Sequence, residues 1–291
     1  MKKIGFVLLI LTFFFSCKQE SELETEISKI DIKVNVERVD LAFANATSDD
    51  LPKLKATFHF LFSERIPDSL WVQQMNDTLQ QELSSEVKKT FADFDDIHME
   101  LRGLFQHLKY YDTSFSEPRV ITITSYVDYR NKTIVTDSLL IIALDTYLGS
   151  DHNFYADIPR YIAQNMNKSE IIVDVASDYA DKYIFQSQRK TLLDEMIYYG
   201  KVLYFKDAML PNKSDAEKIG YTQEQLDWAA ANEEEVWSYF IERELLYSTD
   251  RDLPSRFIAD APFSKFYLDL DNQSPGRLGQ YIGWQIVRAY M

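Results

Sequence analysis

A single cysteine, Cys17, ends an apolar N-terminal segment and constrains how the folded part can be stabilised. Lys2 and Lys3 precede an apolar run from Ile4 to Phe15, and Ser16 and Cys17 follow directly. This order is typical of a secretory signal peptide, and the run is shorter than the ~20 apolar residues of a spanning helix. Because the chain has no second cysteine, it can form no intramolecular disulfide, and packing must hold it together.

The residues around Cys17 predict that this thiol carries a lipid. Phe14, Phe15, Ser16 and Cys17 form a loose lipobox, in which Ser16 is the required small residue and Phe14 replaces the commoner Leu. An ordinary signal peptide with a chance cysteine is the alternative, although a lone free thiol is unusual in an exported protein. We therefore expect cleavage after residue 16 and a two- or three-chain lipid on Cys17, which gives stable membrane anchoring.

The segment that follows the cysteine is polar and acidic. Residues 18–28 read KQESELETEIS and contain no aromatic side chain, which predicts a solvated tether over 17–28. An acidic stretch after a lipidated cysteine also resembles the surface-export signals of lipoproteins from Bacteroidetes, and a simple spacer is the other interpretation. Residues 29–291 would then form a single globular domain.

The charge of the chain argues against nucleic acid as a partner. The formal net charge is −15, and removal of Lys2 and Lys3 with the signal peptide changes it to −17, which repels phosphates. The same charge disfavours docking on an anionic bilayer, so the lipid must do the anchoring. The 19 Phe, 18 Tyr and 4 Trp can supply an apolar core.

Hydrophobic periodicity predicts an α+β, helix-dominated fold with a small sheet in a single domain. Ile32, Val34 and Val36 alternate with polar residues, and residues 138–144 (SLLIIAL) form a continuous apolar run, as in a strand covered on both faces. Strands are expected over 32–36, 119–127 and 138–144. Helices are expected over 51–62, 70–75, 77–91, 95–111, 157–166, 169–185, 188–205, 222–231, 233–247 and 275–290.

The chain lacks the sequence motifs of common enzymes. Zinc hydrolases carry a His-Glu-x-x-His helix, but the histidines, His59, His98, His107 and His152, have no such spacing. Neither a Gly-x-Ser-x-Gly elbow nor a phosphate-binding loop is present. Acidic pairs are plentiful and are expected on solvated faces. We therefore expect no catalytic residue, no metal and no cofactor.

Several segments in the second half resemble the gliding-motility lipoprotein GldB family of Bacteroidetes. The segments are 143–149 (ALDTYLG), 192–204 (LLDEMIYYGKVLY), 210–211 (LP), 219–222 (IGYT), 232–237 (NEEEVW), 246–249 (LYST), 261–263 (APF) and 274–291 (SPGRLGQYIGWQIVRAYM). The resemblance implies a place in the machinery of gliding, a system linked to adhesin secretion, with other envelope proteins of that machinery as partners. It implies a lipid-anchored protein of the outer membrane or periplasmic face, and no known reaction.

A fainter resemblance concerns predicted zinc proteases of the zincin type. Ser177, Asp178 and Asp181 would take the His, Glu and His positions of the first helix, and Tyr199 with Gly200 would replace the Glu-Gly pair of the second. Zinc prefers imidazole and thiolate ligands, so this resemblance implies a degenerate fold without its metal. The alternative is that these are two ordinary amphipathic helices.

The last predicted helix, 275–290, has two interpretations. Ser274 and Pro275 form a favourable helix start, and the following glycines allow close approach of another backbone. Its apolar face predicts packing into the core, whereas Arg277 and Arg288 could contact the acidic surface of a partner.

Two functions from different classes remain open on the sequence. The first is a non-enzymatic component of the gliding apparatus that acts through protein contacts. The second is a cell-envelope hydrolase with an unrecognised carboxylate site. Stoichiometric zinc and peptidase activity lost on chelation would exclude the first, whereas co-purification with envelope proteins and without metal would exclude the second.

Overall fold

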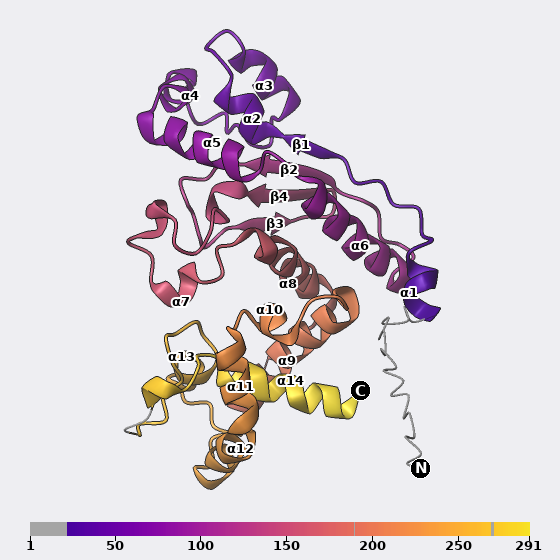
Figure 1. Ribbon diagram of the computed structural model, residues 1–291, viewed down its shortest axis with the longest axis vertical. Coiled ribbons are helices and arrows are strands. Elements are labelled where there is room, and N and C mark those ends of the chain that lie inside the picture. The colour runs from indigo at the N-terminus through magenta and orange to yellow at the C-terminus, as the bar shows by residue number, and fades with distance from the viewer. Residues whose placement is uncertain (1–21, 189, 269–270) are drawn as a thin grey trace, which may run out of the picture.

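Four short strands pair into one mixed sheet in the order β1-β2-β4-β3 (Figure 1). β1 and β4 both run parallel to β2, whereas β3 pairs antiparallel with β4. The computed structural model describes residues 22–188, 190–268 and 271–291, so the predicted signal peptide and Cys17 lie outside the described residues. The strands are β1 (Val36–Arg38), β2 (Arg119–Ile123), β3 (Thr133–Val135) and β4 (Leu139–Ala143).

Helices make up most of the remaining structure and confirm a helix-dominated α+β domain. The N-terminal helices are α1 (Glu22–Ile27), α2 (Val39–Ala44), α3 (Leu51–Thr57), α4 (Asp68–Met75), α5 (Thr78–Thr90) and α6 (Asp95–Tyr111). The later helices are α7 (Arg160–Ala163), α8 (Ile171–Tyr183), α9 (Leu192–Met209), α10 (Asp215–Ile219), α11 (Gln223–Ala231), α12 (Glu233–Glu242), α13 (Leu253–Phe257) and α14 (Leu278–Tyr290).

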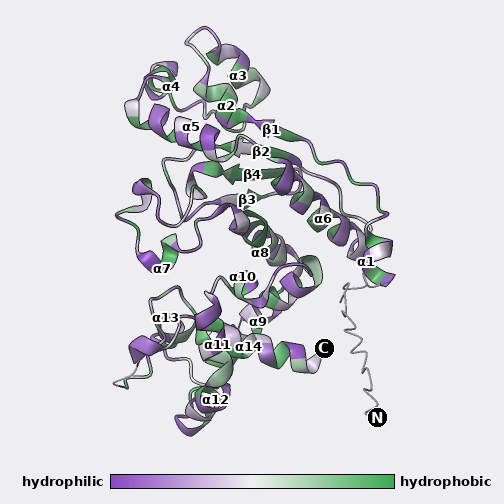
Figure 2. Cartoon of the chain, in the orientation of Figure 1, coloured by the Kyte–Doolittle hydropathy of each residue, from purple (hydrophilic) through white to green (hydrophobic). Residues whose placement is uncertain are grey.

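The two faces of the sheet contact different helices, because successive side chains of a strand point to opposite faces. Val120, Leu140 and Ile142 are fully buried in a core shared with α5, α6 and α8. Ile121 faces the other way and packs against α2, α3 and α4. Figure 2 shows hydrophobic residues concentrated in β4 and α8, between these layers. The apolar run expected over 138–144 is therefore β4, an interior strand covered on both faces.

The C-terminal helices α9 to α14 pack around a second apolar core, below the sheet in Figure 1. Trp284 and Phe240 are its largest fully buried side chains. The helices from α2 to α8 with the sheet are called the sheet lobe, and α9 to α14 the helical lobe. Met209 and Leu210, at the end of α9, belong to the core of the sheet lobe, so α9 joins the two lobes.

The strand expected over 32–36 is mostly unpaired, because β1 begins only at Val36. The preceding extended segment lies along α6 instead. His98 Nε2 hydrogen-bonds the Val34 carbonyl oxygen at 2.9 Å, and Gln106 Nε2 donates to the Ile30 carbonyl oxygen at 2.8 Å. Side chains of α6 thus hydrogen-bond the backbone carbonyl groups of this segment, which would pair with a neighbouring strand if the segment were part of the sheet.

The end of the segment expected as a solvated tether is folded onto the domain. Residues 22–27 form α1, and Ile27 is buried. The Glu24 carboxylate lies 3.2 Å from Nε2 of His107 in α6. Two apolar residues of this acidic segment, Leu23 and Ile27, stand one helical turn apart. Ile27 is the one that packs into the domain beside α6, whereas Leu23 is exposed.

The last helix begins at Leu278, three residues after the expected start at Pro275. Arg277 precedes it with φ of 58°, and the Leu278 N–H donates to Ser264 Oγ at 3.2 Å. A Cβ atom at Gly276 would collide with the Ala261 carbonyl oxygen. The chain at 274–276 therefore packs against the 261–264 loop, and a serine from that loop caps the helix in place of Ser274.

Helices α9 and α14 cross in direct backbone contact at two glycines. A Cβ atom at Gly200 would collide with the backbone of Gly283, and one at Gly283 would collide with the Met196 carbonyl oxygen. This close approach confirms that the last helix packs into the core. Trp284, the next residue of α14, is fully buried at this crossing.

Gly283→Ala should destabilise the protein by about 1–3 kcal/mol, because the added methyl group must push two helices apart. The matched control is Gly103→Ala in α6, where an added Cβ meets nothing within 4 Å and better helix propensity should stabilise by up to ~1 kcal/mol. Urea unfolding measures both free energies. Equal stability of Gly283→Ala and the parent would contradict the close crossing.

Candidate functional site

A polar cavity of about 450 Å³ lies between the sheet lobe and the helical lobe, and we call it the interlobe cavity. It collects charged side chains from several elements, on a scale typical of small-ligand pockets. The 3₁₀ turn η3 (Lys168–Glu170) leads into α8 and places Glu170 one helical turn before Asp174. The charged residues that line the cavity are Arg130, Lys132, Glu170, Asp174, Lys206, Lys218, Asp260 and Arg277.

Lys218, Lys206 and Glu170 are the most deeply buried charged groups of the cavity wall, with exposed fractions of 6%, 7% and 8%. Lys218 has a counterion in Asp207, whereas Lys206 and Glu170 have none so close among the described residues. Lys206 Nζ donates to the Lys218 carbonyl oxygen at 2.9 Å. Burial raises the pKa of Glu170 to about 7 and lowers the pKa of Lys206 to about 8. Charged forms of both groups are disfavoured because water is excluded, so both change protonation near neutral pH.

The carboxyl group of Glu170 accepts no hydrogen bond from any donor within the described part of the chain. Asp174, by contrast, is bound by Lys132 Nζ at 2.5 Å and by the Tyr147 hydroxyl at 2.8 Å. Of the two acids on this helix face, Asp174 is therefore neutralised by the protein and Glu170 is not. The carboxyl oxygens of Glu170 are therefore left to contact whatever occupies the interlobe cavity, which Glu170 lines.

Arg277 lies in the wall of the interlobe cavity. Its Nη2 donates to the Gly220 carbonyl oxygen at 3.0 Å, and its guanidinium group lies over the Tyr221 ring at 5.4 Å from the centroid. Asp260 is 3.5 Å from Arg277 Nε. The structure thus places this residue between the lobes, and its expected contact with a partner protein stays a prediction.

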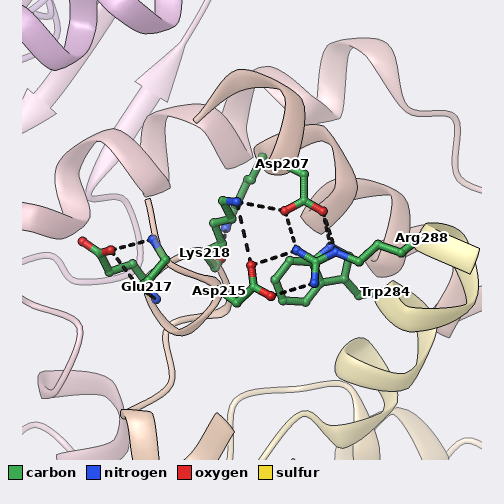
Figure 3. A network of polar contacts seen from close by, with 8 residues as sticks. Asp207, Asp215, Glu217, Lys218, Trp284 and Arg288 are labelled. Atoms are coloured by element: carbon green, nitrogen blue, oxygen red, sulfur yellow. Dashed lines mark hydrogen bonds and ion pairs between the residues drawn. The ribbon is translucent and has the colours of Figure 1, made fainter. Parts of the chain in front are cut away.

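Arg288 lies in an ion-pair network at the crossing of α9, α10 and α14 (Figure 3). Its guanidinium nitrogens donate to Asp207 and Asp215, each at 2.7 Å, and stack on the Trp284 ring at 3.7 Å. Lys218 Nζ is 3.0 Å from Asp207, so the network extends to the cavity wall. The guanidinium group of Arg288 is therefore already paired with two carboxylates of its own chain. Its expected contact with a partner protein stays a prediction.

Ser177 and Asp178, two of the positions expected from a lost metal site, have local structural partners. The Ser177 hydroxyl donates to the Val173 carbonyl oxygen at 2.9 Å, within its own helix. Asp178 accepts a hydrogen bond of 2.6 Å from Thr133 of β3. Burial raises the pKa of Asp178 to about 6. Asp178 therefore attaches α8 to the edge strand β3, whereas Ser177 serves its own helix.

Asp181 and Tyr199, the other two positions expected from a lost metal site, contact different residues from Ser177 and Asp178. Asp181 is exposed and accepts a hydrogen bond of 2.8 Å from the Tyr198 hydroxyl, whereas Tyr199 packs against the core of the helical lobe. The four side chains thus have separate partners. Across 22–188, 190–268 and 271–291, no group of three His, Cys, Asp or Glu residues could hold a metal ion.

Sequence reasoning missed Glu170 and Lys206, although one of them left a signal. Lys206 continues the stripe of buried residues Leu192, Met196 and Leu203 along α9. A lysine at the helical spacing of buried apolar residues is itself expected to be buried. Buried lysines are rare in proteins unless they are paired or functional. Glu170 left no comparable signal, because its burial arises from the packing of the two lobes.

The features above define a helix-dominated α+β domain with a polar cavity between two lobes. A family model described as Gliding motility protein GldB matches residues 20–291. The match covers most of the chain, which therefore belongs to the GldB family, and membership implies a gliding-motility lipoprotein. Neither the curated proteins nor the solved structures include a match, so the expected likeness to zincins has no support from a known structure.

Glu170→Gln should change how stability depends on pH. Burial raises the pKa of Glu170 from its ordinary value of 4.5 to about 7, so its contribution to stability is fully present below about pH 4.5 and is lost as pH rises through 7. An amide cannot ionise. Between pH 4.5 and 8 the variant should therefore gain on the order of 3 kcal/mol relative to the parent.

Urea unfolding of Glu170→Gln and parent at a series of pH values measures this difference. Glu224→Gln, at an exposed position of α11, is the control and should follow the parent at every pH. If the Glu170→Gln and parent curves run parallel from pH 4.5 to 8, the acid does not titrate in the folded protein as described.

Proposed function

We propose that this protein serves the gliding machinery as a lipid-anchored module that acts through protein contacts, and that an apolar groove near α1 receives its partner. The groove measures about 680 Å³ and lies between the C-terminal ends of α6, α8, α9 and α14. Aromatic and aliphatic side chains form most of its wall. Its principal residues are Tyr111, Tyr183, Tyr204, Phe205, Ile286 and Tyr290.

The exposure of the groove is the observation that carries the proposal. Tyr290 and Met291 have exposed fractions of 88% and 72%, and Tyr111 of 54%. Large apolar side chains gathered on one open surface are uncommon on monomers, and they mark binding sites for proteins or membranes. Tyrosine suits such a site, because it combines a large apolar ring with a polar tip.

The position of the groove indicates what kind of partner it receives. Glu24 of α1 lies near enough to Tyr111 to raise the pKa of that phenol, after the larger effect of burial. Figure 1 shows α1 on the same side as the end of α14. Five peptide steps separate Cys17 from Glu22 and span at most about 18 Å. A lipid on Cys17 would therefore hold the groove close to the membrane surface.

We infer that the occupant is an apolar helical segment of a neighbouring envelope protein at that surface. An apolar helix face can fill a groove of this kind with side chains spaced one turn apart. Protein charge does not attract the domain to anionic lipid, since the net charge is −15. Within the described residues no helix has the length and hydropathy to cross a bilayer.

Gliding of cells that carry Tyr111→Glu together with Tyr290→Glu tests the groove. Two carboxylates in the apolar wall should abolish spreading on agar, because an apolar partner cannot solvate buried charge. The matched control is Tyr247→Glu, which alters a tyrosine of 79% exposure outside the groove. Normal spreading by the double variant, at unchanged cellular level and melting temperature, would contradict the proposal.

Cys17→Ala tests the anchor. Without the thiol no lipid can be attached, so the protein should leave the membrane fraction and appear in the soluble fraction. Ser16→Ala keeps a small residue before the cysteine and should fractionate as the parent does. Membrane fractionation by immunoblot gives the result, and a Cys17→Ala protein that stays with the membranes would exclude the lipid anchor.

A further inference from the structure

We propose that the interlobe cavity binds a small organic carboxylate, with the anionic group held between Lys206, Arg277 and Glu170. This inference concerns a different surface from the apolar groove and does not rest on the proposed function. Both lobes contribute to the cavity, Glu170 from the start of α8 and Lys206 from α9. A ligand placed there would contact both lobes at once.

Lys206 has N–H donors that are not used within the described chain. A lysine ammonium group has three N–H donors, and Lys206 spends one on the Lys218 carbonyl oxygen. No carboxylate of the described chain lies within ion-pair distance of its nitrogen. A buried cation without a counterion is costly, and an anion in the cavity would lower that cost.

Other positive charges lie near Lys206 and repel its ammonium group. Burial is the main cause of its lowered pKa, and the positive charges of Arg277 and Lys132 add to it, while Asp174 and Glu170 act in the opposite direction. Lys132 is paired with Asp174 at 2.5 Å, but Arg277 has only the longer contact of 3.5 Å with Asp260. Arg130 also lines the cavity without an ion pair to any described residue but is exposed, so Lys206 and Arg277 are the less exposed cations available to a ligand.

The balance of charge in the wall favours a carboxylate over a phosphate. Three acids, Glu170, Asp174 and Asp260, offset much of the positive charge of the five lysines and arginines that line the cavity, so a singly charged anion suits it better than a doubly charged one. A singly charged carboxylate meets less repulsion, and protonated Glu170 can donate a hydrogen bond to it. Charge-assisted hydrogen bonds of this kind are the stronger ones in proteins.

The remaining wall suits an apolar body on the ligand. Ile162, Val173 and Ile219 supply aliphatic surface, and Tyr129 and Tyr161 supply aromatic surface. The volume of about 450 Å³ accommodates a small molecule together with some water. An acylated amino acid has this combination of one carboxylate and an apolar side chain.

The protonation state of Glu170 should make the affinity for a carboxylate depend on pH. Glu170 faces Asp174 of its own helix, Lys206 of α9, Lys132 before β3 and Lys213 after α9. Protonated Glu170 donates to the ligand, whereas its ionised form repels it. Carboxylate binding should therefore be strongest below pH 7 and should weaken as pH rises to 8 and above.

Titration of the full-length protein in detergent with N-acetylleucine, followed by ligand-observed NMR, tests the proposal. N-acetylleucinamide, which has the same body without the charge, is the matched ligand control, and inorganic phosphate is the third probe. We expect the acid to bind at pH 6 at least about tenfold more tightly than the amide, the size of one charge-assisted hydrogen bond. We expect phosphate to bind more weakly than the acid.

Two variants assign the site. Lys206→Met should weaken binding of N-acetylleucine by about tenfold or more, whereas Lys201→Met, an exposed lysine of the same helix, should leave it unchanged. Glu170→Gln should bind nearly equally at pH 6 and 7, because its amide donates at both and Lys206, with a pKa of about 8, stays mostly charged over that range. This second variant tests the site even if Lys206→Met does not fold.

Several outcomes would overturn the inference. They are no binding of the acid at pH 6, equal binding of the acid and the amide, or tighter binding of phosphate. Unchanged affinity in folded Lys206→Met, or a Glu170→Gln protein with the pH dependence of the parent, would do the same. Loss of acid binding with normal gliding would still leave the groove proposal standing, because the two sites lie on different residues.

Discussion

The backbone contact of α9 with α14 is the interaction on which the other features of the structure depend. Gly200 and Gly283 allow the two helices to approach until no side chain fits between them. That approach brings Arg288 of α14 to Asp207 of α9. It also places Arg277, at the start of α14, opposite the sheet lobe. The interlobe cavity and the apolar groove both use α9 for part of their walls.

Buried charge distinguishes the interlobe cavity from the rest of the core. Removing Glu170 and Lys206 from water is unfavourable for folding, and neither is fully compensated by a partner in the chain. The network around Arg288 differs, because each of its charges has a close counterion. Ionisable groups that lack a partner in a cavity, such as Glu170 and Lys206, are candidates for function. The paired charges around Arg288 are sufficiently explained by their contribution to stability.

The two candidate surfaces differ in chemistry and in location. The apolar groove lies beside α1, the element closest in sequence to Cys17, and suits an apolar partner segment. The interlobe cavity lies between the lobes and suits a charged small molecule. A ligand that touches both lobes would favour one relative arrangement of α8 and α9. Helix α9 lines both surfaces, with Tyr204 and Phe205 in the groove and Lys206 in the cavity.

The sequence alone determined the local structure and the family of this protein. Apolar periodicity placed β2, β4, α5, α6 and α8 within a few residues, because each has an uninterrupted apolar pattern. It missed the short elements β3, α1, α2, α10 and α13. It also overextended the first strand, whose preceding carbonyl groups are bound by His98 and Gln106. The closing block from 274 to 291 was sufficient for the family resemblance.

Only the tertiary structure decided where the charges lie. Glu170 and Lys206 are 36 positions apart along the printed sequence, and their burial follows from the docking of two lobes rather than from any local pattern. Likewise Arg277 and Arg288 look alike in the sequence, yet one lines a cavity and the other is held by two carboxylates. Periodicity reports which face of a helix is covered, but the partner that covers it depends on contacts between residues far apart in the chain.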